Sequence, residues 1–450
     1  MLIKYRRGDV LSLAVLLFVV TAIGLMIAYL VSRHGEQSEH GRLLFGAPSY
    51  ARSADEIVYP GSAASGNDEA PDRMPLYVGL IVLSKLVGGI HWSYVLIGIQ
   101  GALVLLCGAM LHRTASRLTS VPWVPALVTL AYAAHIGLQL ENFALRETVT
   151  YELFIVAFIY FATQKPATNK SVAFMVLACV LAFYTRPTGV LMLAPLGLFI
   201  LFIPATPLRH RLHILSWAIG AVVLCALPWQ VYQSHAQGRF TLSATAVGGW
   251  NFFKGNSFAF EAVSPYIDHD QADSYVDEIR DRYRASQVGS HSVSARTEDD
   301  YLRALGNADV RADYSRYIRK IILRIAVYLS PLETPLGTAQ IKVENGRVVL
   351  MRYRGNFVDA DENWISFFEQ MSFFVVLFAI PLGMLGSLRG IVSAPTIRPV
   401  AVASIAIVAI HIATHAMLTA ETRYRLPLDP LLLLWAGIAT GHVFARSSND

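Results

Sequence analysis

Residues 31–77 read VSRHGEQSEHGRLLFGAPSYARSADEIVYPGSAASGNDEAPDRMPLY, a polar stretch between two strongly apolar parts of the chain. An apolar run of about twenty residues, the length that crosses a bilayer, precedes it. Acidic residues occur in it at Asp55, Glu56, Asp68, Glu69 and Asp72. A carboxylate-rich segment between apolar runs is typical of a loop at a membrane surface. We therefore expect the rest of the chain to hold this loop beside a bilayer.

The composition indicates a membrane protein. Of the 450 residues, 54% are hydrophobic and only 15% are charged, which excludes an ordinary soluble domain. Cys107, Cys179 and Cys225 all lie in apolar runs, so neither a loop disulfide nor a metal-ligand pattern is indicated. The net charge of +5 is better explained by membrane orientation than by nucleic-acid binding. The N-terminal apolar run lacks a small-residue cleavage site, so we interpret it as a retained first helix.

Apolar runs of about 17 to 25 residues predict about ten transmembrane helices. They lie at 10–32, 93–111, 122–141, 143–163, 171–186, 188–204, 213–233, 365–387, 399–418 and 427–445. Basic residues between them fall on one side, which the positive-inside rule makes cytoplasmic. These residues are Lys4, Arg6, Arg7, Arg113, Arg117, Lys165, Lys170, Arg209, Arg211, Arg389, Arg398 and Arg446. Both termini are then inside, and 33–74 and 234–363 lie outside.

The predicted fold is an all-α polytopic membrane protein with two sizeable outer loops. Residues 1–233 form an N-terminal membrane module whose first outer loop spans 33–77, and residues 364–450 form C-terminal membrane helices. Between them, residues 234–363 are expected to cap the bundle. This part contains a polar helical stretch around 273–284 and a hairpin turn at Asn345-Gly346.

Two shorter apolar segments are predicted to lie at the interface rather than to cross. The segment 318–336 holds three basic residues, which favours an interfacial amphipathic helix near 318–330. Pro75–Ile90 is too short to span and contains Lys85. We expect it to be partly inserted beside the first loop.

Four arginines lie on the outer side, against the orientation rule. Arg146, Arg186, Arg423 and Arg425 each fall close to the start of a helix that descends from outside. Helix N-termini present free N–H groups, so an arginine there favours phosphate binding. The alternative is that these arginines pair with lipid headgroups or with carboxylates such as Glu147 and Asp429.

Ionisable residues at membrane depth are functional candidates by default. Glu147 is therefore a site candidate, and Glu152 a weaker one; the competing role is that of a structural partner of an arginine. His411 and His415 are four residues apart on one helix face, which fits a metal pair, but no third ligand accompanies them. Hydrogen-bonded histidines inside a bundle are the commoner case.

Several short motifs occur in an order that is similar to one family. They are Asp55-Glu56, Arg73-Met74-Pro75-Leu76-Tyr77, Leu145-Arg146-Glu147-Thr148, Thr185-Arg186-Pro187-Thr188-Gly189, Gly248-Gly249-Trp250-Asn251 with Gly255-Asn256, and Arg423-Tyr424-Arg425-Leu426-Pro427-Leu428-Asp429-Pro430. Together they resemble the GT-C class of glycosyltransferases, in the branch of protein O-mannosyltransferases and the lipid A aminoarabinose transferase. In the loop-end motif, Arg73-Met74 departs from the residues that many members have there.

The resemblance implies roles for these residues. It makes Asp55 the catalytic base with Glu56 as its neighbour, and it assigns the phosphate of a lipid-linked sugar to Arg186, Arg423 and Arg425, with Arg146 beside them. The remaining motif residues are expected to bind substrate. They are Arg73, Tyr77, Glu147, Tyr424 and Asn256.

The implied reaction is the inverting transfer of a sugar from a polyprenyl phosphate to a hydroxyl acceptor. The partners are then the donor, the acceptor and the lipid bilayer, with no nucleic acid. No cofactor is expected, although a divalent metal is left open. A bacterial inner membrane with the site facing the periplasm is the favoured location. The competing interpretations are a flippase for a lipid-linked sugar and a polymerase or ligase of preassembled glycans.

Overall fold

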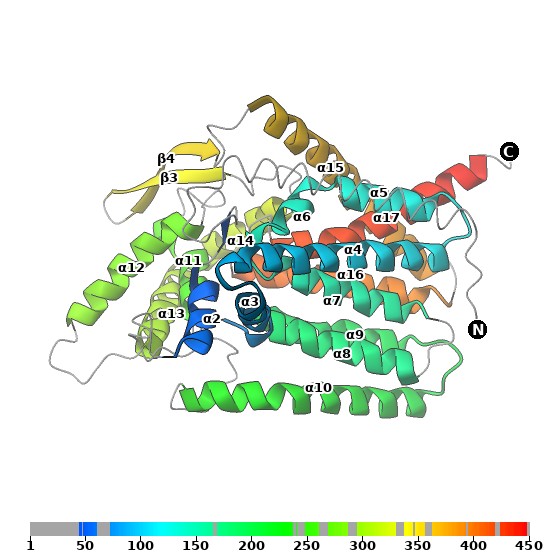
Figure 1. The fold of residues 1–450 in the computed structure, drawn as a ribbon, viewed down its shortest axis with the longest axis horizontal. Helices are drawn as coiled ribbons and strands as arrows, with labels where there is room; N and C mark the ends of the chain where they lie inside the picture. The colour runs from blue at the N-terminus through cyan, green and yellow to red at the C-terminus, as the bar shows by residue number, and fades with distance from the viewer. Residues whose placement is uncertain are drawn as a thin grey trace.

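The computed structural model describes most of the chain from Phe45 onward (Figure 1). The described residues are 45–46, 48–60, 73–164, 169–236, 240, 248–260, 269–286, 295–329, 337–344, 347–355, 362–392, 395–418 and 424–447. The first predicted span at 10–32 and the loop carboxylates Asp68, Glu69 and Asp72 lie outside them, as does Arg423.

A bundle of helices occupies most of the described structure. Its elements are α4 (Trp92–Leu118), α5 (Val124–Ala134), α6 (Ile136–Glu141), α7 (Thr148–Ala162), α8 (Asn169–Thr185), η3 (Pro187–Met192), α9 (Leu193–Leu201), α10 (Leu208–Ala236), α15 (Glu362–Val392), α16 (Arg398–Met417), η6 (Leu426–Leu428) and α17 (Asp429–Ser447). Each of the nine predicted spans after the first coincides with one or two of these elements.

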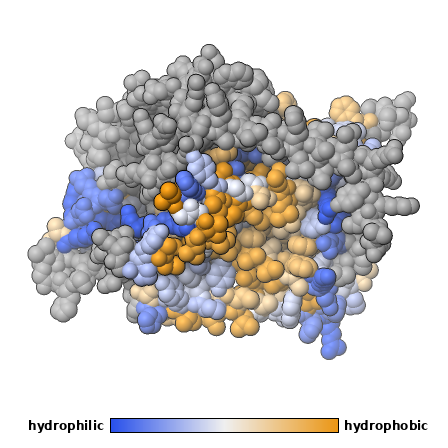
Figure 2. All heavy atoms as spheres, viewed as in Figure 1, coloured by the Kyte–Doolittle hydropathy of each residue, from blue (hydrophilic) through white to orange (hydrophobic). Residues whose placement is uncertain are grey.

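The predicted class, a helical polytopic membrane protein, is confirmed. Within the described residues, five helical stretches are long and apolar enough to cross a membrane. They are Pro75–Leu118, Leu208–Ala236, Val375–Val392, Arg398–Met417 and Leu426–Phe444. Figure 2 shows a broad hydrophobic band across the middle of the described surface, with hydrophilic residues toward both ends. The total of ten spans stays a prediction.

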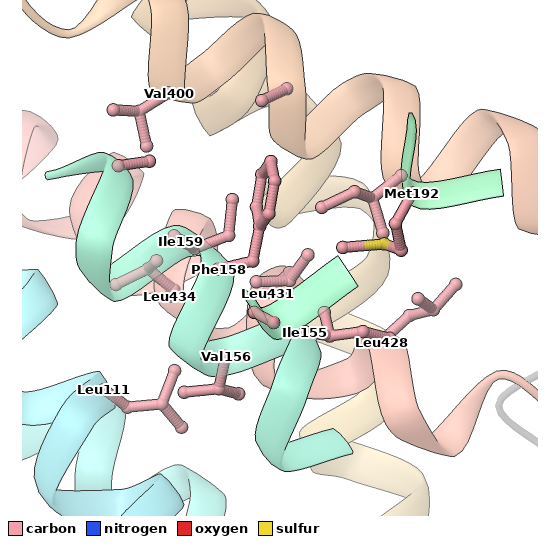
Figure 3. Close-up of a cluster of buried hydrophobic side chains, with 14 of the residues drawn as sticks. Leu111, Ile155, Val156, Phe158, Ile159, Met192, Val400, Leu428, Leu431 and Leu434 are labelled. Carbon is pink, nitrogen blue, oxygen red and sulfur yellow. The ribbon is translucent and has the colours of Figure 1, made fainter. Parts of the chain in front are cut away.

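Helix α7 lies at the centre of the bundle. Ile155, Val156 and Phe158 have no exposed surface, because α7 packs against α4, α8 and α16 and the start of α17 lies beside it. The close-up in Figure 3 shows these side chains meeting Leu111, Val400 and Leu431 from three other helices. A largely apolar helix is expected in such a position, and its one acid, Glu152, is buried and accepts a hydrogen bond from the Tyr132 hydroxyl at 2.7 Å.

Pro75–Gly88 forms a separate helix, α3, that leads into α4. The backbone N–H of Gly89 bonds to the Lys85 carbonyl, and Gly89 has a φ of 54°, a conformation that glycine adopts without strain. A 3-10 turn, η2 (Gly89–His91), then continues into α4, so the apolar helical stretch runs from Pro75 to Leu118.

The described residues between α10 and α15 form a cap at one end of the bundle (Figure 1). Its elements are α11 (Gly248–Asn256), η4 (Phe258–Phe260), α12 (His269–Ser286), α13 (Ala295–Ala312), α14 (Tyr314–Tyr328), β3 (Gly337–Glu344) and β4 (Arg347–Gly355). The hairpin prediction is confirmed, because β3 and β4 pair antiparallel across Asn345-Gly346. Phe253, Val276 and Leu302 bring α11, α12 and α13 together in a small apolar cluster.

Part of the predicted first outer loop is helical, and this part carries Asp55 and Glu56. They lie on α2 (Pro48–Val58). Its buried residues Tyr50 and Ala54 are four positions apart, so they share a face that packs on Tyr77 of α3. That helical period outweighs the local polar composition. A short parallel pair, β1 (Phe45–Gly46) with β2 (Ala144–Leu145), joins this region to the start of α7.

Helices α15 and α17 approach closely at glycines, which gives a first prediction. A Cβ at Gly386 would lie 2.2 Å from the Trp435 carbonyl oxygen, so Gly386→Ala must separate the two helices. Overpacking of this kind costs about 1 to 3 kcal/mol, and we expect a lower melting temperature for the purified protein. Gly220→Ala in α10 is the matched control, because nothing lies within 4 Å of its Cβ. Equal melting of both variants would contradict the prediction.

Candidate active site

The carboxylate of Glu147 is the centre of a polar cluster at the cap end of the bundle. Glu147 directly precedes α7 and accepts a hydrogen bond from the Tyr50 hydroxyl at 2.5 Å. Its other oxygen accepts from Nε of Arg186, also at 2.5 Å. The Glu147 and Arg186 side chains are 13% and 11% exposed, so this ion pair is largely withdrawn from solvent. Charge-assisted bonds in such surroundings fix the geometry strongly.

Local sequence brings each partner to this point. Arg186 precedes Pro187, the first residue of η3, and takes the extended conformation that a following proline favours. Gly189 then allows η3 to fold back on α8, since a Cβ there would lie 2.2 Å from the Ala182 carbonyl carbon. On the other side, α2 presents Tyr50. Burial, and then the Glu147 carboxylate, raise the pKa of Tyr50 well above its usual value, so its hydroxyl remains a donor.

Aromatic rings surround the guanidinium of Arg186. Its Cζ lies 5.4 Å from the ring centre of Tyr151 and 5.7 Å from that of Tyr424. The Tyr424 ring stacks on His415 at 4.5 Å, and His415 faces Tyr328 at 5.7 Å. Rings packed around a guanidinium hold it in place, and they are also surfaces on which a sugar can stack.

Of the two histidines on α16, His411 has hydrogen-bond partners at both ring nitrogens. Nε2 of His411 lies 2.7 Å from the Tyr151 hydroxyl, and Nδ1 lies 2.8 Å from the Ile407 carbonyl oxygen. Both ring nitrogens therefore have partners. In the part of the chain that the structure describes, no group of three or more His, Cys, Asp and Glu residues is arranged to hold a metal ion. The expectation that no metal is required stays a prediction.

Arg425 lies in a buried ion-pair network. Its Nε donates to Asp429 at 2.8 Å and its Nη1 to the Tyr328 carbonyl at 3.0 Å. The second Asp429 oxygen lies 2.9 Å from Nε2 of His135. Arg146 similarly lies 3.5 Å from Glu141. The three predicted phosphate-binding arginines that the structure describes thus each have a carboxylate partner, the alternative that the sequence left open.

Asp55 lies farther along α2 than Tyr50. Five residues separate them, about 7.5 Å along a helix axis. Lys85 of α3 binds Asp55 at 2.5 Å, and Lys85 also lies 4.9 Å from the Trp92 ring centre. The Asp55 side chain is 35% exposed, so one side of its carboxylate is open, and Glu56 is exposed. Lys85 fixes the orientation of Asp55 while leaving it accessible.

Two residues of the loop-end motif, Arg73 and Tyr77, contact α2. Arg73 donates from Nε to Ser49 at 2.8 Å, and its Cζ lies 4.7 Å from the Tyr50 ring centre. Tyr77 is fully buried, meets Tyr50 edge-on at 5.0 Å and donates to Gln100 at 2.8 Å. These contacts hold Tyr50 against Glu147.

Asn256 is also fully buried, at the junction of the cap and the bundle. Its Nδ2 donates to the Met417 carbonyl at 3.1 Å, and its Oδ1 accepts from Arg324 at 3.0 Å. The sequence interpretation did not assign Arg324, Tyr50 or Tyr151 to the site. Tyr50 could have been found from the helical period of α2, whereas Tyr151 and Arg324 carry no distinguishing local pattern.

Comparison with known proteins gives similarity in structure alone, since no family profile and no curated sequence matches this chain. The oligosaccharyltransferase of Archaeoglobus fulgidus, solved with a tethered acceptor peptide containing the NVT sequon, aligns over 96% of this chain and 50% of its own, at 12% identity and a TM-score of 0.48. A second structure of that enzyme, AglB, with an inhibitory peptide and dolichol-phosphate, aligns over the same shares at 13% identity and a TM-score of 0.45. The chain thus spans about half the length of the oligosaccharyltransferase.

ArnT from Cupriavidus metallidurans is a further similar structure. Bound to undecaprenyl phosphate, it aligns over 98% of this chain and 79% of its own, at 13% identity and a TM-score of 0.35.

Proposed function

We propose that this chain is a membrane glycosyltransferase that moves a sugar from a polyprenyl phosphate to a hydroxyl acceptor, with inversion. The observation that carries the proposal is the meeting of Glu147, Arg186 and Tyr424, which come from three separate motif segments, at one end of the bundle. Asp55 lies on the adjoining helix α2. The site would face the periplasm at a bacterial inner membrane.

Asp55 supplies the base in this mechanism. Its open oxygen takes the proton of the acceptor hydroxyl as that oxygen attacks the anomeric carbon from the face opposite the phosphate. The bond between the anomeric carbon and the phosphate oxygen breaks, and its electron pair leaves with the polyprenyl phosphate. Positioned cationic donors stabilise that developing charge, at about 3 to 4 kcal/mol each by analogy with oxyanion-hole donors. Arg186 and Arg425, together with Arg146 and Arg423, are the donors that the resemblance implies.

The location of the charges favours an enzyme over a flippase. Transporters of lipid-linked sugars are expected to place polar groups near the membrane midplane. Here the Glu147–Arg186 pair and Asp55 lie at the cap end, and α7 carries no charged residue beyond Glu152.

The proposal is tested with membranes that contain the chain and a panel of polyprenyl-phosphate sugars with hydroxyl acceptors. Mass spectrometry should detect free polyprenyl phosphate together with glycosylated acceptor, in equal amounts. A panel of oligosaccharide carriers tests the polymerase or ligase interpretation in the same assay. Movement of the intact donor across the bilayer without release of phosphate would contradict a transferase and support the flippase.

A further inference from the structure

Two buried cations lie one turn apart on α14, where the cap meets the bundle. Lys320 and Arg324 are only 4% and 3% exposed. Lys320 donates to the Ser257 carbonyl at 2.9 Å. Arg324 donates from Nη1 to the Asn256 side chain and to the Ala416 carbonyl, both at 3.0 Å. All of these acceptors are neutral, so they satisfy hydrogen bonds but do not balance the charge.

Neither cation has a carboxylate within salt-bridge distance among the described residues. The acid that acts on Lys320 is Asp309 of α13, whose Oδ2 accepts from the Ser257 hydroxyl and the Phe258 backbone N–H. Nη2 of Arg324 is buried and has no hydrogen-bond acceptor in the described structure. Buried charge without a counter-charge is costly, so its retention points to an anion that binds here.

The electrostatics of the pair agree with this geometry. Burial, and then the charge of Arg324, lower the pKa of Lys320 to about 7. Burial also lowers the pKa of Arg324, to about 10. The groups around Lys320 are Arg316 and Arg324 on its own helix and Asp309 on α13, while α11 and α16 contribute neutral acceptors around the pair. An anion between these cations would reverse both shifts.

The pair borders the candidate active site. Arg324 holds the carbonyl of Ala416, and the ring of the preceding residue, His415, stacks on Tyr424. Tyr424 in turn lies against Arg186, the partner of Glu147. By contrast, Arg186 and Arg425 are already paired with carboxylates. Of these four cations in the described structure, the two buried ones that lack a carboxylate partner thus lie on α14.

We infer that Lys320 and Arg324 bind a phosphate monoester, with the buried and unsatisfied Nη2 of Arg324 as a donor to it. Two cations match the charge of a phosphate monoester, which approaches −2 near neutral pH. The sugar-linked donor is a phosphodiester and carries less negative charge. The inference rests on the proposed function in one respect, namely that polyprenyl phosphate is the source of the phosphate monoester. On that basis α14 stabilises the leaving group more strongly than the intact donor, the difference that accelerates a reaction.

The test is binding of a long-chain polyprenyl phosphate, without sugar, to the full-length protein in nanodiscs. We expect Arg324→Gln and Lys320→Met each to weaken binding by about tenfold to a hundredfold, the usual effect of losing a charge-assisted partner. Arg282→Gln is the matched control, since Arg282 is exposed on α12 of the same cap. Polyprenol, which lacks the phosphate, should bind wild type and Arg324→Gln equally.

Competition with inorganic phosphate distinguishes the two sources of the phosphate group, which are a lipid headgroup and free phosphate. If millimolar phosphate displaces the lipid, the site takes free phosphate; if it does not, recognition requires the lipid. Both outcomes keep the phosphate assignment. Unchanged affinity in Arg324→Gln, or equal affinity of wild type for polyprenol and its phosphate, would overturn it. Because no donor turnover is involved, this result is independent of whether sugar transfer is observed.

Two further measurements distinguish a ligand-binding role of Lys320 and Arg324 from a structural one. Removing an unbalanced charge should leave the ligand-free melting temperature of Arg324→Gln at or above that of wild type, whereas a structural arginine would lower it. Affinity of wild type should fall as the pH rises above 7, because Lys320 must take up a proton to bind the anion. Lys320→Arg should bind without this alkaline loss. If the loss persists in Lys320→Arg, Lys320 is not a phosphate ligand.

Discussion

Replacing Asp55 by Asn is expected to slow sugar transfer by about 10² to 10⁴-fold while donor binding is retained, the range of a general base. The carboxylate is positioned for that role by Lys85 at 2.5 Å, and its side chain is 35% exposed. An amide of the same shape keeps one oxygen for Lys85 but cannot accept the acceptor proton. The measurement is release of polyprenyl phosphate under single-turnover conditions, with donor binding followed in parallel.

Two controls accompany this variant. Glu56→Gln removes the neighbouring carboxylate, which is exposed, and should change the rate far less than Asp55→Asn. Lys85→Met removes the group that orients Asp55, so it should also lower the rate of sugar transfer. Supplying a small hydroxyl acceptor should not restore that rate. If Asp55→Asn is as active as wild type, Asp55 is excluded as the base and Glu147 becomes the first alternative.

Features encoded over short stretches of chain were predictable. The apolar runs predicted the bundle helices from 93 onward, with ends that differ by up to seven residues, since run length sets helix length. Asn345-Gly346 gave the hairpin, because that dipeptide suits a tight turn between strands. Arg186-Pro187 gave a helical start at the correct residue, for the same local reason.

Pairing between distant segments was not predictable. Glu147 was weighed as a partner of arginines in general, but the choice of Arg186 over Arg146 depends on how η3 folds back on α8. Lys320 and Arg324 were used only as evidence for an interfacial helix. Their burial without an acidic partner among the described residues follows from the packing of α14 on α16 and from the bond of Arg324 to Asn256, which one sequence does not report. The helical period of Tyr50 and Ala54 in α2 was likewise not recognised, because the surrounding sequence is polar.

The Glu147–Arg186 pair is expected to show the largest effect on stability. Arg186→Met leaves the Glu147 carboxylate with the Tyr50 hydroxyl as a remaining donor, in a site that is mostly closed to water. Breaking a buried pair from one side typically costs about 3 to 5 kcal/mol, because the other charge is stranded. We therefore expect a large drop in the melting temperature of the purified protein.

Glu147→Gln tests the same pair from the other side, and the double variant completes a cycle. With both charges removed no group is stranded, so the double variant should be more stable than Arg186→Met alone. The exposed pair of Arg282 and Glu278, at 2.5 Å on α12, is the matched control and should show coupling near zero. Strict additivity at Glu147 and Arg186 would mean that the two side chains do not depend on one another. Activity distinguishes the roles further, since a purely structural pair should recover transfer in the double variant, whereas a pair that contacts the donor should not.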